Sequence, residues 1–130
     1  MGAWGTGPFD NDAARAWLEE LETAEDVEEV VEWLAREVDW PDGAAWLDAE
    51  EAAQVRVTAE LVAAAIGRPA KELPAELRDW LEAADTEVTH RDLDMVRTLV
   101  RRLPASGLQL EAGAADELAA RLQVIGPEEH

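Results

Sequence analysis

The stretch from Asp48 to Ile66 constrains the fold of this chain more than any other. Asp48 can cap the first amide groups of a helix, and Glu51 stands at the position that completes a capping box. In the second half of the stretch, apolar residues fall on both sides of the helix, with Val62 on one side and Leu61 on the other. Such a helix is stable only where other elements cover it, so we expect this half to be central and surrounded.

Helical spacing of apolar residues recurs along the rest of the chain. No stretch of useful length alternates between apolar and polar residues, and no internal repeat is evident. We therefore predict an all-α fold, an irregular bundle of five to six helices in a single helical domain of residues 1–130. The expected helices cover approximately residues 13–22, 27–38, 48–66, 74–84, 90–103 and 114–122.

Glycines alternate with large aromatic side chains at the N-terminus. Glycine takes positive φ without strain, so we expect residues 1–10 to turn back tightly and to press their rings onto the helices as an N-terminal plug. Asp10 or Asn11 would then cap the first helix. The residues of this structural motif are Gly2, Trp4, Gly5, Gly7, Phe9, Asp10, Asn11, Asp12 and Trp17.

The same N-terminal pattern, Gly-x-Trp-Gly-x-Gly-x-Phe-Asp-Asn-Asp-x-Ala, resembles the start of a largely bacterial family known as domain of unknown function 4259. Two further segments, 58–69 and 73–81, resemble the same family. The resemblance covers about the first hundred residues and fades after Leu103, so residues 104–130 form a divergent C-terminal part. It implies a small helical domain and brings no activity with it.

The chain is strongly acidic, with 30 Asp and Glu against 11 Lys and Arg and a formal net charge of −19. This charge repels nucleic-acid phosphates and anionic membranes, so we expect neither as a partner, and it attracts basic proteins. The absence of cysteine excludes disulfides and thiolate metal sites. No apolar run is long enough to span a bilayer, and we expect a cytoplasmic protein.

Much of the acid lies on the outward side of the second predicted helix. Such a ridge is either a solvated face or a surface for a basic partner. Two tryptophans flank the Pro-Gly turn that follows, either as core residues or as an exposed aromatic contact. The predicted interaction surface consists of Glu25, Glu28, Glu29, Glu32, Trp40 and Trp46.

Glu60 is the one acid within a strongly apolar helical stretch. Either Arg56 holds it at the rim of the core, or it is buried and paired with an arginine. In the second case Glu60, Arg97 and Arg101 could bind a ligand in a pocket. The sequence His90-Arg-Asp-Leu93 has the letters of a kinase catalytic loop, but no glycine-rich loop or strand lysine accompanies it. We expect Asp92 to be only the third residue of a capped helix.

The leading hypothesis from these features is that the chain is a non-enzymatic interaction protein of the inhibitor or immunity type. We expect no catalytic residue, no metal ligands and no cofactor, because no nucleophile and base pair and no convergent ligand set stands out. Two alternatives stay open: a ligand-binding domain or enzyme that uses Glu60 and the arginines of the fifth helix, and a nucleic-acid mimic. The sequence does not indicate an oligomeric state.

Overall fold

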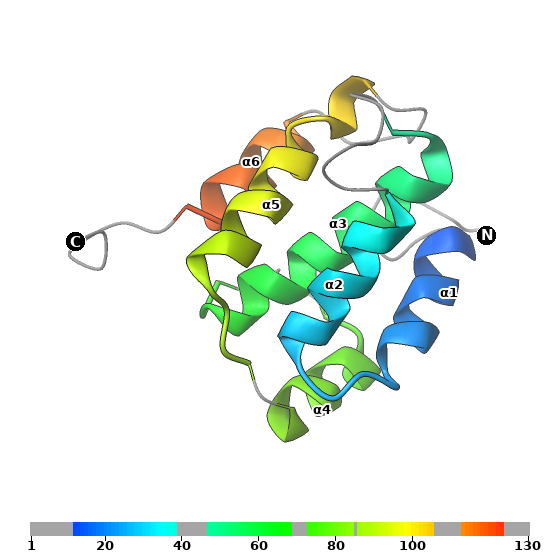
Figure 1. The fold of residues 1–130 in the computed structure, drawn as a ribbon, viewed down its shortest axis with the longest axis vertical. Coiled ribbons are helices and arrows are strands. Elements are labelled where there is room, and N and C mark those ends of the chain that lie inside the picture. Colours follow the sequence, from blue (N-terminus) through cyan, green and yellow to red (C-terminus); the bar gives the residue numbers. More distant parts are fainter. Residues whose placement is uncertain (1–11, 39–46, 69–72, 85, 106–112, 124–130) are drawn as a thin grey trace.

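The computed structural model describes residues 12–38, 47–68, 73–84, 86–105 and 113–123. Within these ranges the chain forms six α-helices and one short 3-10 helix, and no strand (Figure 1). The prediction of an irregular all-α bundle is therefore confirmed. The elements are α1 (Asp12–Leu21), α2 (Val27–Glu37), α3 (Ala49–Ala65), α4 (Ala75–Ala83), α5 (His90–Val100), η1 (Leu103–Ala105) and α6 (Ala114–Arg121).

α3 runs through the middle of the described structure, and α1, α2, α5 and α6 all pack against it (Figure 1). Every residue from 52 to 63 is buried, so the burial extends into the N-terminal half of the helix, further than the apolar pattern predicted. Four polar side chains are carried into the interior with it. They are Gln54, Arg56, Thr58 and Glu60.

The ends of α3 follow the signals in the sequence. The Asp48 carboxylate accepts a hydrogen bond from the Glu51 amide at 2.8 Å, and the Glu51 carboxylate accepts one from the Asp48 amide at 3.1 Å. This capping box satisfies two amide groups that the helix itself leaves free. At the other end Gly67 takes a positive φ of 92°, a conformation that glycine adopts without strain, and the chain turns away.

α1 and α2 each bury one stripe and expose the opposite side, as their periodicity predicted. Trp17 in α1 is buried, and its indole N–H donates to the Thr58 hydroxyl of α3 at 2.8 Å. Trp33 is half-buried at the edge of the α2 stripe. The Asp26 side chain caps α2 by accepting from the Glu29 amide at 2.8 Å.

α4 and α6 complete the described core at its two ends. Trp80 of α4 is buried and donates from its indole nitrogen to the Ala24 carbonyl in the α1–α2 connection, at 3.0 Å. α4 begins one residue after Pro74, whose fixed φ suits a helix start. α6 follows Gly113, which has a positive φ of 75°, and buries Leu118 and Leu122.

Several sequence predictions concern residues outside the described ranges. The interpretation of residues 1–10 as an N-terminal plug, with Asp10 or Asn11 as a cap, is one of them. The choice between core and contact for Trp40 and Trp46 is another. These remain predictions, whereas two members of the same motif are described: Asp12 begins α1, and Trp17 lies in the core.

Candidate functional site

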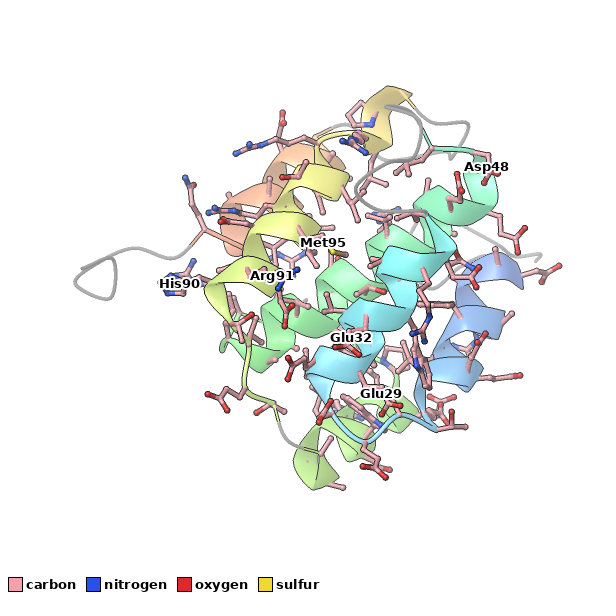
Figure 2. All side chains as sticks on the ribbon, viewed as in Figure 1. Glu29, Glu32, Asp48, His90, Arg91 and Met95 are labelled. Atoms are coloured by element: carbon pink, nitrogen blue, oxygen red, sulfur yellow. The ribbon has the colours of Figure 1, made fainter. Side chains whose placement is uncertain are left out.

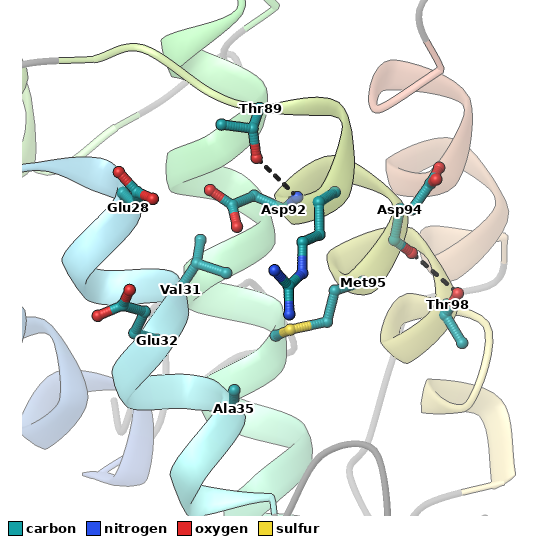
Figure 3. A pocket seen from close by; sticks show the side chains of 10 residues that line it. Glu28, Val31, Glu32, Ala35, Thr89, Asp92, Asp94, Met95 and Thr98 are labelled. Carbon is teal, nitrogen blue, oxygen red and sulfur yellow. Dashed lines mark hydrogen bonds between the residues drawn. The ribbon is translucent and has the colours of Figure 1, made fainter.

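A groove of about 800 Å³ lies between α2 and α5, and we refer to it as the α2–α5 groove (Figure 3). Acidic, hydroxyl and apolar side chains from the two helices line it together with one arginine. The lining residues are Glu28, Val31, Glu32, Ala35, Thr89, Arg91, Asp92, Asp94, Met95 and Thr98.

The spacing of the lining residues explains how two short helices build the groove. On α2 they recur at intervals of three and four, from Glu28 to Ala35, so they share one side of that helix. Val31 and Met95 belong to the buried core, whereas Glu28 and Glu32 are exposed. The groove therefore combines an apolar floor with acidic rims.

Three of the four acids in the groove have an unpaired carboxylate or oxygen. Within the described ranges, Glu28 and Glu32 form no ion pair and no side-chain hydrogen bond. The Asp92 Oδ2 atom is buried and lacks a hydrogen-bond partner among the same residues. Leaving an acceptor unpaired in a buried position costs free energy, so the fold itself does not explain why Asp92 Oδ2 stands beside the groove without a donor.

The first two turns of α5 place two of the groove acids. The Thr89 hydroxyl accepts a hydrogen bond from the Asp92 amide at 3.1 Å, which confirms Asp92 as the third residue of a capped helix (Figure 3). Asp94 is bound from the side by Arg97, with 2.5 Å between Nη2 and Oδ1. Asp92 consequently keeps its charge free of a partner, whereas Asp94 shares its charge with Arg97.

The structure divides the predicted acidic ridge of α2 into two parts. Glu28 and Glu32 line the groove. Glu29 instead belongs to the helix start, because its carboxylate accepts from the Glu25 amide at 2.8 Å while its own amide donates to Asp26. Glu25 lies before the first residue of α2 and does not line the groove. Part of the ridge is thus engaged in capping.

Glu60 is buried, with a side chain that is 4% exposed, and its partner is Arg121 of α6. Arg121 donates from Nη1 to Oε1 at 2.9 Å and from Nη2 to Oε2 at 3.0 Å, a two-pronged geometry that suits a carboxylate. The expectation that Arg56 holds Glu60 at the rim is therefore wrong. The described residues also show no ion pair from Glu60 to Arg97 or Arg101.

Two further residues extend this pair into what we call the Glu60–Arg121 cluster, which comprises Glu60, Arg68, Glu117 and Arg121. Glu117 accepts from Arg121 Nε at 2.7 Å and from Nη2 at 3.0 Å. Arg121 and Arg68 each donate to the other's backbone carbonyl at 3.3 Å. The cluster joins the end of α6 to α3 and to the turn after it.

The charges in the cluster act on Arg121. Partial burial lowers its pKa, but the hydrogen bonds and negative charges of Glu60 and Glu117 outweigh that effect. The net result is a pKa raised above the usual value for arginine. Arg121 therefore carries its positive charge at neutral pH, and the Glu60 carboxylate faces a cation there.

Sequence reasoning singled out the α2 acids but missed what faces them. Asp94, Met95 and Thr98 on α5 received no role, and Arg121 was not identified as the partner of Glu60. The sequence does contain a local signal for the pair of Glu117 and Arg121, because oppositely charged residues four positions apart on a helix stabilise it. The distance of 61 residues between Arg121 and Glu60 gave no local signal.

The described part of the chain contains no group of three or more His, Asp or Glu side chains arranged to hold a metal ion. In the same ranges, no helix has the length and apolar character needed to cross a bilayer.

The chain matches the family model of Domain of unknown function (DUF4259) over residues 2–117. The chain belongs to this family. The DUF4259 match passes Leu103, where the sequence resemblance was expected to fade, and ends within α6. It includes every residue that lines the α2–α5 groove and ends four residues before Arg121. No curated protein and no solved structure matches the chain.

Proposed function

We propose that this DUF4259 member is a non-enzymatic interaction module that binds a basic protein partner through the α2–α5 groove. One observation carries the proposal: Glu28 and Glu32 of α2 line the same groove as Asp92 and Asp94 of α5, with Val31 and Met95 between them, and three of these four acids lack a partner within the described ranges. Among the lining residues that the structure describes, four carboxylates against a single arginine give the groove an excess of negative charge.

The apolar floor of the groove favours a protein partner over a small cation. Lysine and arginine side chains carry an aliphatic stem that packs on apolar surface while the charged end reaches a carboxylate. Val31 and Met95 offer that surface between the acidic rims. Charges arranged in this way speed the encounter with an oppositely charged partner and select against acidic ones.

The alternative pocket of Glu60 with Arg97 and Arg101 has no comparable support. Both oxygens of Glu60 accept hydrogen bonds from Arg121, so the carboxylate is already neutralised. Arg97 is paired with Asp94. A ligand that used this acid would have to displace Arg121 first.

The test is a titration of the protein with a peptide of six arginines at low salt, in which calorimetry measures the binding affinity. The double variant Glu28→Gln with Glu32→Gln should weaken binding about tenfold. Each substitution removes one charge–charge interaction with the peptide, and at a solvent-screened surface such an interaction is worth roughly a factor of three in affinity. The control is Glu19→Gln with Glu22→Gln, which removes the same charge from one exposed position of α1 and from the exposed residue directly after that helix. Equal weakening by both pairs would mean that only the net charge matters, and the proposal would fail.

A further inference from the structure

Among the described residues, Arg91 is the one cation that lines the α2–α5 groove. It belongs to the first turn of α5, and Figure 2 shows it between α5 and α2, close to Met95 and on the same face as Glu32. Within the described ranges it forms no ion pair, although four carboxylates line the same groove.

Helix stability does not account for this position. The first turn of a helix carries the positive end of the helix dipole, so a cation there is unfavourable. The exposed side chain also makes no hydrogen bond to a described residue that would offset this cost. The groove supplies a reason, because its carboxylates create a negative potential at the place where Arg91 lies.

We propose that Arg91 is the resident cation of the groove, and that an arginine of the partner displaces it on binding. This inference rests on the proposed function, and it names the chemistry of the partner: a segment that presents an arginine. A guanidinium is planar, donates to two carboxylates at once and stacks its aliphatic stem on apolar surface, whereas an ammonium is a compact and strongly hydrated charge. The Oδ2 atom of Asp92 is buried and unsatisfied among the described residues, so a guanidinium that displaces neighbouring side chains on entering the groove would supply the donor that it lacks.

Displacement of Arg91 predicts an effect on affinity that a general attraction between the acidic protein and a basic partner does not predict. If Arg91 competes with the partner, removing it should tighten binding, because one like charge at roughly 6 Å in water opposes the incoming cation by about a factor of three. The matched control is Arg101→Gln. Arg101 is also exposed and follows the same helix, but it does not line the groove.

The experiment titrates the parent protein, Arg91→Gln and Arg101→Gln with a peptide of six arginines and with a peptide of six lysines. We expect Arg91→Gln to bind the arginine peptide about threefold more tightly than the parent, Arg101→Gln to change affinity less, and the lysine peptide to bind more weakly throughout. Circular dichroism confirms that each variant keeps its helices.

The outcomes separate this inference from the proposed function. If the parent binds neither peptide, the proposed function fails and the role of Arg91 fails with it. If the parent binds but Arg91→Gln gains nothing, or gains no more than Arg101→Gln, only the displacement of Arg91 is overturned. Equal affinity for the two peptides would overturn the preference for a guanidinium.

Discussion

Glu60 on α3 and Glu28 on α2 are the same amino acid on adjacent helices, with opposite surroundings. Glu60 is buried in the centre of the bundle, and both of its oxygens are bonded to Arg121. Glu28 lies at the rim of a groove, is exposed, and has no partner within the described ranges. The carboxylate in the core is engaged by the fold, whereas the carboxylate at the groove is not.

The difference shows which acids can serve a partner. A buried charge must be paired because desolvation is costly, so Glu60 and Arg121 depend on each other for the folded state. An exposed carboxylate adds little to stability, and two of them four residues apart on one helix repel each other slightly. Folding therefore explains Glu60 but gives no reason for Glu28 and Glu32 to stand together at the groove.

The largest effect should come from breaking the buried pair. Arg121→Met leaves the Glu60 carboxylate buried without its cation, and we expect the free energy of unfolding to fall by about 3 to 5 kcal/mol. Denaturant melts measure this loss. Because removing both charges together is far less costly, Glu60→Leu combined with Arg121→Met should recover most of the stability.

The exposed Arg101→Met serves as the control for the loss of an arginine as such, and it should change the free energy of unfolding by less than about 0.5 kcal/mol. If Arg121→Met costs no more than this control, the Glu60–Arg121 cluster does not hold α6 in place. Glu60 would then not be a carboxylate on which the folded state depends, and its contrast with Glu28 would not hold.

The smallest effect should come from the groove. Glu28→Gln with Glu32→Gln removes a favourable acid from the first turn of α2 and also relieves the repulsion between the two side chains. These small terms oppose each other, and we expect the free energy of unfolding to stay within about 0.5 kcal/mol of the parent. The same denaturant melts measure it, and a loss above about 1 kcal/mol would show that the groove acids are structural.

The sequence was sufficient for the helices because their signals are local. The capping box of Asp48 and Glu51, the cap at Thr89 and the stop at Gly67 lie within a few residues of the helix ends that they specify. Periodicity likewise identified the buried stripes of α1 and α2. These features follow from backbone hydrogen bonding and side-chain spacing, which a single sequence contains.

The sequence alone did not indicate which side chains pair between helices. Arg121 reaches Glu60 across 61 residues, and nothing near either residue specifies the other. The groove similarly depends on how α2 and α5 approach each other, so Glu28 and Glu32 were identified as a ridge while Asp94 and Met95 were not recognised as the opposite wall. Tertiary packing decides such contacts, and one chain without its relatives carries little record of them.

The most direct test of the account maps where a basic ligand binds. Backbone amide shifts of the labelled protein would be recorded by nuclear magnetic resonance during titration with a peptide of six arginines at low salt. We expect the changes to concentrate on residues 28–35 of α2 and on residues 89–98, which comprise the N-cap and most of α5, because these two ranges hold all the described residues that line the groove. Changes spread evenly over the exposed acids of α1, α2 and α4 would contradict the account, because the groove acids would then be no different from the rest of an acidic surface.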